Sequence, residues 1–284
     1  MGDNKSRWFI LGILCLFFVI IFAFYINFFI NQAHHFSVDF FDVGQGDATL
    51  IQFENGEKML VDCSINEQIL SKLGEALPFF DRTIDYLLIT HPDNDHYGGC
   101  PAVLKRYNVK HIITNGVQKI GDPLWDAFEK YYQSENADYK IINGQDQLKV
   151  GDNHFIFLSP DDDLQMDKNK MDGNNSSIVF LLENNIGRFL FTGDMEIPLE
   201  AALLKKYCDV GSCSFLRADY LKVGHHGSDS SSSDAFLSAV MPKYAVISVG
   251  PNKFGHPSLR ILRKLDRIGA KIWRTDLKDD IIVK

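Results

Sequence analysis

The chain has 284 residues, of which 45% are hydrophobic and 23% charged, which is enough for one large domain or two small ones. Its formal net charge of −8 excludes a general electrostatic attraction to nucleic acid, although a local basic groove stays compatible with this balance. The sequence contains no Walker-type phosphate loop and no Gly-x-Ser-x-Gly nucleophile elbow.

The first predicted element is a transmembrane helix. Residues 8–30 carry no charged side chain, and a helix of this length spans a bilayer at about 1.5 Å per residue. Lys5 and Arg7 precede the run and no Lys or Arg follows until Lys58, so the positive-inside rule sends the rest of the chain outside. A cleaved signal peptide is the alternative, but the run is long and its end fits the small-residue cleavage pattern poorly. We therefore expect an uncleaved signal anchor.

Residues 1–33 are thus predicted to form a tail and a single-pass anchor in the cell membrane, and residues 34–284 an extracytoplasmic domain. An even number of cysteines in that domain suits an oxidising compartment: Cys63, Cys100, Cys208 and Cys213. Of these, Cys208 and Cys213 could close a small loop. Four unpaired, buried cysteines are the alternative.

Short apolar segments between turn residues predict two similar series of strands and helices. After a linker at 31–36, the first series has strands at 38–43, 48–53, 58–62, 84–90 and 109–114 and helices at 66–77, 98–107 and 123–134. The second has strands at 140–142, 147–150, 154–158, 177–183, 187–191, 218–223, 244–249 and 271–274, helices at 197–207, 233–240 and 258–268, a polar loop at 161–175 and a last apolar piece at 281–283. This order predicts two packed sheets with helices outside.

The richest motif follows the strand at 84–90 and runs from Thr90 to Gly99. It places two imidazoles and two carboxylates within six residues: His91, Asp93, Asp95 and His96. A short loop after a buried strand can direct all four into one space, where they suit a divalent metal or two metals. A polar turn with surface histidines is the alternative. Asp194 and the pair His225-His226 favour the metal site, because they also follow apolar, strand-like runs.

The order of these motifs resembles the metallo-β-lactamase fold superfamily, and within it the extracytoplasmic hydrolase domain of ComEC-type DNA-uptake proteins. The resemblance covers nearly all of residues 37–284. It rests on the segments Phe41 to Ala48, Leu60 to Asp62, His91 to His96, Asn174 to Val179, Phe191 to Asp194, Leu221 to Ser228 and Gly255 to Pro257. It implies an α+β fold, a four-layer αββα sandwich, preceded here by the transmembrane helix.

The resemblance also implies a ligand set for two divalent metal ions. His91 and Asp93 would hold the first ion, Asp95 and His96 the second, Asp194 would bridge both, and His225 or His226, with His225 favoured, would complete the second site. The second histidine of the superfamily pattern His-x-His-x-Asp-His is Asp93 here, and the Asn174 loop lies where a later histidine is usual. The site is therefore rich in oxygen, and zinc or manganese is expected.

Catalytic roles follow from the same resemblance. Asp95 would orient the attacking water, and Lys222 with His226 would contact a phosphate or protonate the leaving oxygen. Asp62 would orient a ligand histidine. Two residues keep two interpretations: His256 either joins the site or belongs to a structural turn, and Asp47 either supports the metal loop or caps a turn.

The function implied is that of a membrane-anchored, outward-facing nuclease that cleaves DNA through a metal-activated water. ComEC-type proteins carry many membrane helices and this sequence predicts one, so a separate channel protein is a candidate partner in DNA uptake during competence. One alternative is an extracellular phosphodiesterase or esterase for small or surface-bound esters such as phosphorylcholine, and another is a lactamase or lactonase. A third is a catalytically silent, anchored binding module, although such a module is expected to lose ligands that are present here.

Overall fold

The computed structural model describes residues 3–30, 34–134, 137–164, 173–208 and 212–284. The chain divides into two compact units, Met1–His35 and Phe36–Lys284. Half of the predicted linker (31–33) and about half of the predicted polar loop (165–172) lie outside the described residues. The expected boundary between residues 33 and 34 stays a prediction.

In its described residues the N-terminal unit contains one helix, α1 (Asp3–Ile30). Its segment Arg7–Tyr25 is long and apolar enough to cross a membrane, and no other helix in the described ranges meets that condition. From Trp8 to Tyr25 the side chains of this segment are exposed. The predicted N-terminal helix is thus confirmed as a candidate membrane span.

The second unit is built on two seven-stranded sheets. The first sheet has the order β14 (Ile281–Val283), β1 (Ser37–Phe40), β2 (Thr49–Gln52), β3 (Lys58–Val61), β4 (Thr83–Leu88), β5 (Asn108–Thr114) and β6 (Asp138–Ile141). Pairing is antiparallel from β14 to β3 and parallel from β3 to β6.

The second sheet has the order β13 (Lys271–Arg274), β12 (Tyr244–Ile247), β11 (Tyr220–Lys222), β10 (Arg188–Phe191), β9 (Val179–Glu183), β8 (Asn153–Ser159) and β7 (Gln147–Val150). Strands β7 to β10 form an antiparallel meander, and β10 to β13 are parallel.

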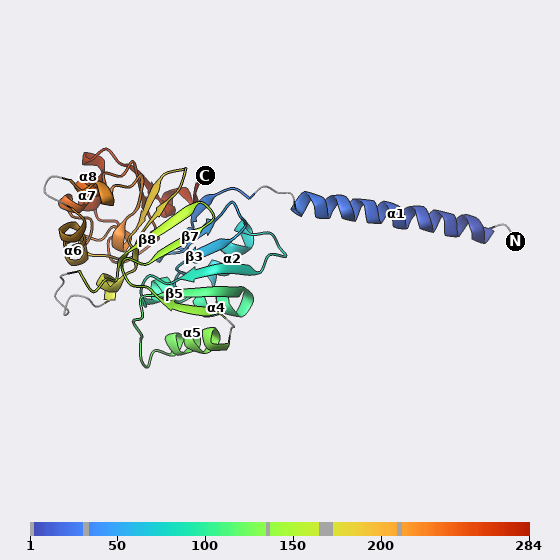
Figure 1. Ribbon diagram of the computed structural model, residues 1–284, viewed down its shortest axis with the longest axis horizontal. Coiled ribbons are helices and arrows are strands. Elements are labelled where there is room, and N and C mark those ends of the chain that lie inside the picture. The colour runs from blue at the N-terminus through green and yellow to red at the C-terminus, as the bar shows by residue number, and fades with distance from the viewer. Residues whose placement is uncertain (1–2, 31–33, 135–136, 165–172, 209–211) are drawn as a thin grey trace. The chain divides into compact units, whose positions relative to one another are not determined.

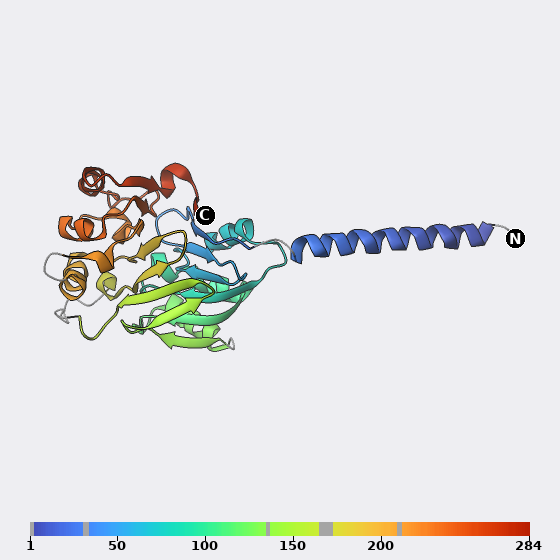
Figure 2. The same ribbon diagram turned by 45° about the horizontal axis from the view of Figure 1, so that its top comes forward.

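Helices cover the outer face of each sheet (Figures 1 and 2). Those on the first sheet are α2 (Gln68–Ala76), α4 (Cys100–Arg106) and α5 (Pro123–Ser134), and those on the second are α6 (Ile197–Tyr207), α7 (Asp234–Val240) and α8 (Leu259–Arg267). Serine side chains begin the last two: Ser233 Oγ accepts from Phe236 N–H, and Ser258 Oγ from Ile261 N–H. The predicted α+β fold, a four-layer αββα sandwich, is confirmed.

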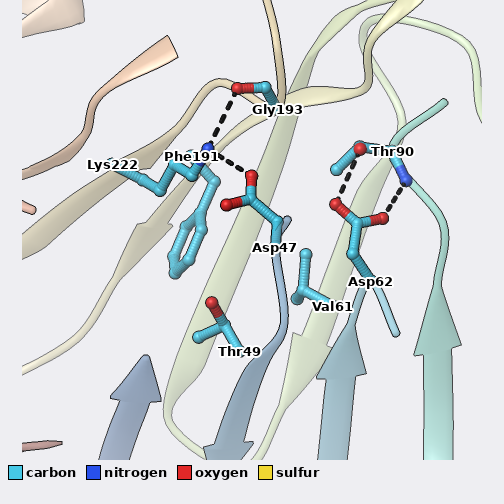
Figure 3. Close-up of a pocket in the computed structure, with 8 residues that line it drawn as sticks. All are labelled: Asp47, Thr49, Val61, Asp62, Thr90, Phe191, Gly193 and Lys222. Atoms are coloured by element: carbon cyan, nitrogen blue, oxygen red, sulfur yellow. Dashed lines mark hydrogen bonds and ion pairs between the residues drawn. The ribbon is translucent and has the colours of Figure 1, made fainter. Parts of the chain in front are cut away.

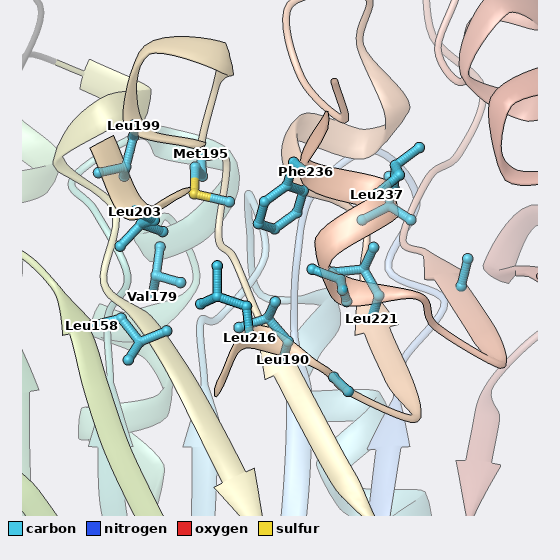
Figure 4. Close-up of a cluster of buried hydrophobic side chains, with 14 of the residues drawn as sticks. Leu158, Val179, Leu190, Met195, Leu199, Leu203, Leu216, Leu221, Phe236 and Leu237 are labelled. Carbon is cyan, nitrogen blue, oxygen red and sulfur yellow. The ribbon is translucent and has the colours of Figure 1, made fainter. Parts of the chain in front are cut away.

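Apolar packing holds the layers together. Leu190 and Leu221 of the second sheet, Leu203 of α6 and Phe236 of α7 are all buried in one cluster (Figure 4). Between the sheets a second cluster is rich in phenylalanine, and its members include Phe40, Phe155, Phe180, Phe189 and Phe191. Burying one such side chain contributes about 1.5–3 kcal/mol. This inner core fixes the two sheets against each other, and with them the strand ends that carry the polar motifs.

Strand pairing departs from the predicted order in two places. The strand expected at 140–142 belongs to the first sheet, where β6 pairs with β5 through the α5 crossover, and not to the second series. The last apolar piece returns as β14 and pairs with β1. The turns α3 (Asn94–Tyr97), α9 (Thr275–Lys278), η2 (Gly173–Ser176), η3 (Ser214–Leu216) and η4 (Gly224–Gly227) were not predicted, because three or four residues are too short to show a helical period.

Candidate metal centre

The candidate site lies where strands of both sheets end. In the first sheet β3 ends at Val61, directly before Asp62. Strand β4 ends at Leu88, and His91 lies in the loop that follows it. In the second sheet β10 leads to Asp194, and β11 leads to η4 with His225 and His226. Four polar loops that are far apart in the sequence therefore meet at one edge of the sandwich.

The motif from Thr90 to Gly99 is folded tightly around α3. His96 N–H donates to Asp93 O at 2.8 Å, and this turn brings the His96 ring within 4.2 Å of the His91 ring, centroid to centroid. Both imidazoles are fully buried. A Cβ atom on Gly99 would collide with the carbonyl oxygen of Cys63, which explains why the loop ends in glycine. The loop is thus anchored to the turn that follows β3.

Asp194 lies at the centre of a group of four donors. Its Oδ1 is 3.3 Å from His96 Nε2, and its Oδ2 is 3.5 Å from His226 Nε2. Asp95 Oδ2 is 3.3 Å from the same nitrogen of His226. One ligand atom from each of these residues lies within 4.8 Å of all the others. Two imidazoles and two carboxylates at this spacing suit zinc or manganese.

The buried donor atoms also lack other partners. Among the described residues, His91 Nε2, His96 Nε2 and Asp194 Oδ1 are buried without a hydrogen bond, and the 3.3 Å approach between the last two is not in hydrogen-bond geometry. Buried polar atoms normally find a partner. A bound cation would give these three metal-ligating atoms the partner that they lack in the protein. The residues therefore fit a divalent metal.

Asp62 holds one of the histidines from behind. Its Oδ2 lies 2.8 Å from His96 Nδ1 and accepts from Thr90 Oγ1 at 2.8 Å, while its Oδ1 accepts from Thr90 N–H at 2.8 Å. Asp62 thus lies where we expected a residue that orients a ligand histidine. With Nδ1 held this way, His96 presents Nε2 to the four-donor group.

The two adjacent histidines of η4 face different surroundings. His226 Nδ1 donates to the carbonyl oxygen of Ser248 at 2.8 Å, because that oxygen can only accept. In the neutral ring Nε2 is then the unprotonated nitrogen, and it faces Asp95 and Asp194. We expected His225 as the ligand. The structure turns His225 to Glu196 Oε1, 3.2 Å from its Nδ1, and places His226 in the four-donor group.

Residues expected at the first metal flank this group. His91 Nε2 lies 3.5 Å from Asp93 Oδ2. Asp93 Oδ1 also forms an ion pair with Lys119 Nζ at 2.9 Å. Ser177 links His91 to the centre, since its Oγ lies 3.4 Å from His91 Nδ1 and accepts from Asp194 N–H at 3.1 Å. The first ligand pair is thus adjacent to the four donors but less tightly gathered.

Lys222 occupies a different place from the one expected. Its side chain is only 5% exposed, and its ammonium pairs with Asp47 and donates to the carbonyl oxygen of Gly193 at 3.3 Å (Figure 3). Figure 3 shows this pair between the two sheets, beside Asp62 and Thr90. A substrate contact would break a buried ion pair, which is costly. Lys222 and Asp47 therefore form a buried ion pair beside the four-donor group.

Charges within the cluster shift the ionisation of its members. Burial opposes the charged form of Asp194, but His226 and His96 lower the pKa of its carboxyl well below the usual range. Burial likewise opposes the charged form of Asp95, and the hydrogen bond from His226 with the charge of His96 lowers its pKa to about 2. Burial also opposes the charged forms of His96 and His226, but the surrounding carboxylates together, with Asp194 foremost, raise the pKa values of both. The metal-free centre therefore retains protons that a metal would displace.

Some residues near the centre were missed or left open by the sequence. His256 lies 5.4 Å from His225, centroid to centroid, and outside the four-donor group. Glu196 and Lys119 were not predicted, because neither belongs to a recognisable motif. Only the position of Glu196, two residues after Asp194, could have drawn attention to it.

Comparison with known proteins agrees with this geometry. A family model described as the Metallo-beta-lactamase superfamily matches residues 41–250. Curated relatives include ComE operon protein 3 of Bacillus subtilis (strain 168), 30% identical over 84% of this chain and 32% of that protein. Recombination protein 2 of Haemophilus influenzae is 32% identical over 87% of this chain and 28% of that protein, and competence protein ComA of Neisseria gonorrhoeae is 31% identical over 85% and 31%. The chain spans about a third of the length of these relatives.

Solved structures share the fold. The metallo-beta-lactamase fold protein YhfI from Bacillus subtilis superposes with a TM-score of 0.56 at 12% identity, over 87% of this chain and 99% of that one. CmlA, a diiron beta-hydroxylase from Streptomyces venezuelae, gives a TM-score of 0.56 at 16% identity, over 88% of this chain and 54% of that one. At these identities the likeness shows the architecture alone.

Proposed function

This chain belongs to the metallo-β-lactamase superfamily, and from that premise we propose that it is a membrane-anchored phosphodiesterase that cleaves DNA outside the membrane. Membership makes the chain a metal-dependent hydrolase, and the predicted resemblance to competence proteins is confirmed by its relatives. The observation that carries the proposal is the group of four buried or half-buried donors, Asp95, His96, Asp194 and His226.

We propose the following ligand set for two ions, zinc or manganese. Asp95, His96 and His226 would hold one ion, His91 and Asp93 the other, and Asp194 would contribute to both. When bound, such ions supply a Lewis acid and lower the pKa of water toward neutral. This set keeps five of the residues expected from the sequence and replaces His225 by His226.

The exposure of the ligands indicates where substrate approaches. Asp95 exposes 30% of its side chain, whereas His96, Asp194 and His226 expose 4% or less. A substrate therefore meets the centre on the side of Asp95. From that position the Asp95 carboxylate would orient a water and accept its proton. It is the catalytic residue in this proposal, and Lys222 is a positioning residue.

The ion pair between Lys222 and Asp47 supports the ligands from below. Lys222 Nζ also lies 3.9 Å from Asp194 Oδ1, so its charge offsets part of the negative charge that the carboxylates gather there. Asp62 fixes the orientation of His96 in the same way from the first sheet. Together these residues would keep the ligand geometry constant through a reaction cycle.

We propose that residues 1–33 anchor the chain by a single pass and that the hydrolase domain, residues 34–284, faces the extracytoplasmic side. Lys5 and Arg7 before the apolar segment support this orientation. The disulfides Cys63–Cys100 and Cys208–Cys213 support it too, because such bonds persist in oxidising compartments. The one candidate span in the described ranges cannot line a pore by itself, so a separate channel protein is the proposed partner if DNA is taken up.

A second candidate function is an extracellular phosphodiesterase for small or surface-bound esters. The net charge of −8 favours it, because a polyanionic substrate gains no general attraction to this chain. The two functions share the metal centre and differ only in the substrate that binds beside it.

Cleavage assays distinguish these functions. The full chain in detergent would be loaded with Mn²⁺ or Zn²⁺ and given single-stranded DNA, double-stranded DNA and a chromogenic phosphodiester, with Asp95→Asn as the control. Cleavage of DNA that chelator and Asp95→Asn both abolish is the expected result. Cleavage of the small diester alone would transfer the assignment to the second candidate, and no cleavage by the metal-loaded chain would reject both.

A further inference from the structure

A row of aromatic rings leads from the candidate metal centre to solvent. Ring centroids are 5.7 Å apart for His96 and His226, 6.2 Å for His226 and His225, and 5.4 Å for His225 and His256. The last step joins His256 to Phe254 at 5.8 Å, with the two rings stacked at 20°. Phe254 ends the row and is 63% exposed. The row of neighbouring rings thus connects the candidate ligands His96 and His226 with an exposed phenylalanine.

The loop that carries Phe254 is held by one side chain. Asn252 Oδ1 accepts from Phe254 N–H at 3.0 Å and from His256 N–H at 3.1 Å. Its Nδ2 donates to the carbonyl oxygens of Gly250 at 2.9 Å and His256 at 2.8 Å. The exposed ring is therefore presented by an ordered loop, which lowers the entropy lost when another ring packs on it.

A cationic side chain accompanies the ring. Lys253 is exposed, and its Nζ lies 5.8 Å from the centroid of Phe254. The chain has a net charge of −8, so the positive charge of this lysine beside an exposed aromatic ring is opposite in sign to the overall charge. Proteins that bind single-stranded nucleic acid combine these two groups, a ring for the base and a cation for the backbone.

We propose that Phe254, backed by His256, is a stacking platform for one base of a single DNA strand whose phosphodiester lies at the metal centre, with Lys253 contacting a neighbouring phosphate. The inference rests on the proposed function and specifies its substrate further. It selects single strands, because a base inside a duplex has no free face to offer Phe254. Since every base has such a face, the platform would bind DNA without sequence preference.

The test compares a fluorescent oligothymidine with an abasic strand of the same length. Their binding to the full chain in detergent would be followed by anisotropy, with chelator present so that neither strand is cleaved. Phe254→Ala should weaken binding of the oligothymidine on the order of tenfold, and it should leave the abasic strand unchanged. Phe254→Tyr should retain binding. Phe80→Ala removes another exposed phenylalanine, 82% exposed and outside the row, and should change neither.

Lys253→Ala provides an independent readout. It should weaken the binding of both strands. It should also reduce the slope of log K against log salt by about 0.7, the value for one phosphate contact on a single strand. The platform would be overturned if Phe254→Ala bound each strand as tightly as the wild type does. It would also be overturned if Phe254→Ala lost the same amount of affinity for the oligothymidine and for the abasic strand.

Metal-dependent cleavage separates this inference from the proposed function. If the wild type cleaves single-stranded DNA and Phe254→Ala raises KM with kcat unchanged, both stand. Cleavage with the same KM in Phe254→Ala would overturn the platform and leave the nuclease. Base-dependent binding through Phe254 without any cleavage would leave the platform and reject the nuclease.

Discussion

The backbone at two adjacent histidines decides which of them reaches the metal centre. His225 and His226 have φ values of 47° and 50°, in the left-handed region that non-glycine residues rarely adopt. Such conformations cost on the order of 1–3 kcal/mol each and persist where the surroundings enforce them. In this conformation His226 Nδ1 donates a hydrogen bond to the carbonyl oxygen of Ser248. The strain therefore serves to aim His226 at Asp194.

The sequence could identify this pair as candidate ligands but could not choose between its members. Which way each side chain of Gly224-His225-His226-Gly227 points depends on two positive φ values that no local pattern reveals. The same limit applies to Lys222, whose partner Asp47 is far away in the sequence and lies on the other sheet. By contrast, His91, Asp95 and His96 lie in one loop, where their spacing alone predicts that they gather.

Gly46 is expected to be essential for the shape of the metal loop. Its φ is +143°, and a Cβ built there would lie 2.6 Å from the backbone oxygen of Asp95. Gly46→Ala should therefore displace Asp95 and weaken metal binding by tenfold or more, which corresponds to about 1.4 kcal/mol. Titration with a competing chelator would measure this. Gly44→Ala is the control, since Gly44 has a φ of +73° but no atom near the added Cβ, and equal losses in both variants would contradict the steric explanation.

Metal affinity should rise with pH. The pKa values of His96 and His226 are raised in the metal-free centre, so both keep their protons to higher pH than a free histidine. A metal must displace those protons, so binding is weakest at low pH and strengthens as pH rises through the raised pKa values. Calorimetry in buffers of different ionisation enthalpy would count the protons released. Affinity that falls with rising pH, or binding without proton release, would contradict this.

At the scale of elements, a disulfide joins two loops of the site. Cys63 follows Asp62 and Cys100 begins α4 just after the metal loop, and their bond closes a separation of 37 residues. The sequence predicted an even set of cysteines but singled out only Cys208 and Cys213, because a short spacing is visible locally and a contact between distant loops is not.

Replacing both Cys63 and Cys100 by alanine should lower the free energy of unfolding by about 4 kcal/mol, from the loop-closure entropy of a separation of 37 residues. The matched control replaces Cys208 and Cys213, separated by 5 residues, where the same relation gives about 2 kcal/mol. Urea unfolding under oxidising conditions would measure both. A larger loss in the control pair would contradict the loop-closure argument.

Strand and helix positions were largely accessible from the sequence, whereas strand partners were not. Alternating and continuous apolar runs predicted β9 and α6 to within two residues at each end. The pairing of β6 with β5 and of β14 with β1 depends on which edge of a sheet is free, and that is settled only when both sheets have formed. The last strand, β14, forms the edge of the first sheet beside β1, although the two strands lie at opposite ends of the sheet-forming sequence.

At the scale of the whole hydrolase unit, the candidate metal centre takes its residues from both sheets. Asp62 and His96 come from the first sheet, and Asp194 and His226 come from the second. An ion held by both halves would bind the folded chain and not the unfolded one, so it would stabilise the sandwich by mass action.

Metal removal should therefore lower the stability of the entire unit and not of one loop. At an ion concentration of about 100 times Kd, binding contributes about 2.7 kcal/mol, and chelator should lower Tm by the corresponding few degrees. Asp194→Ala should remove this dependence. Differential scanning calorimetry with and without chelator would test both predictions. A wild-type Tm that does not change when chelator is added would contradict a centre shared by the two sheets.

The most direct test of the account is the metal content per chain of the wild type, His226→Ala and His225→Ala, measured by elemental analysis together with DNA cleavage by the same samples. We predict that His226→Ala loses bound metal and cleavage, whereas His225→Ala retains the metal, because its Nδ1 faces Glu196 and not the four-donor group. Full metal content and activity in His226→Ala, with both lost in His225→Ala, would contradict the proposed centre.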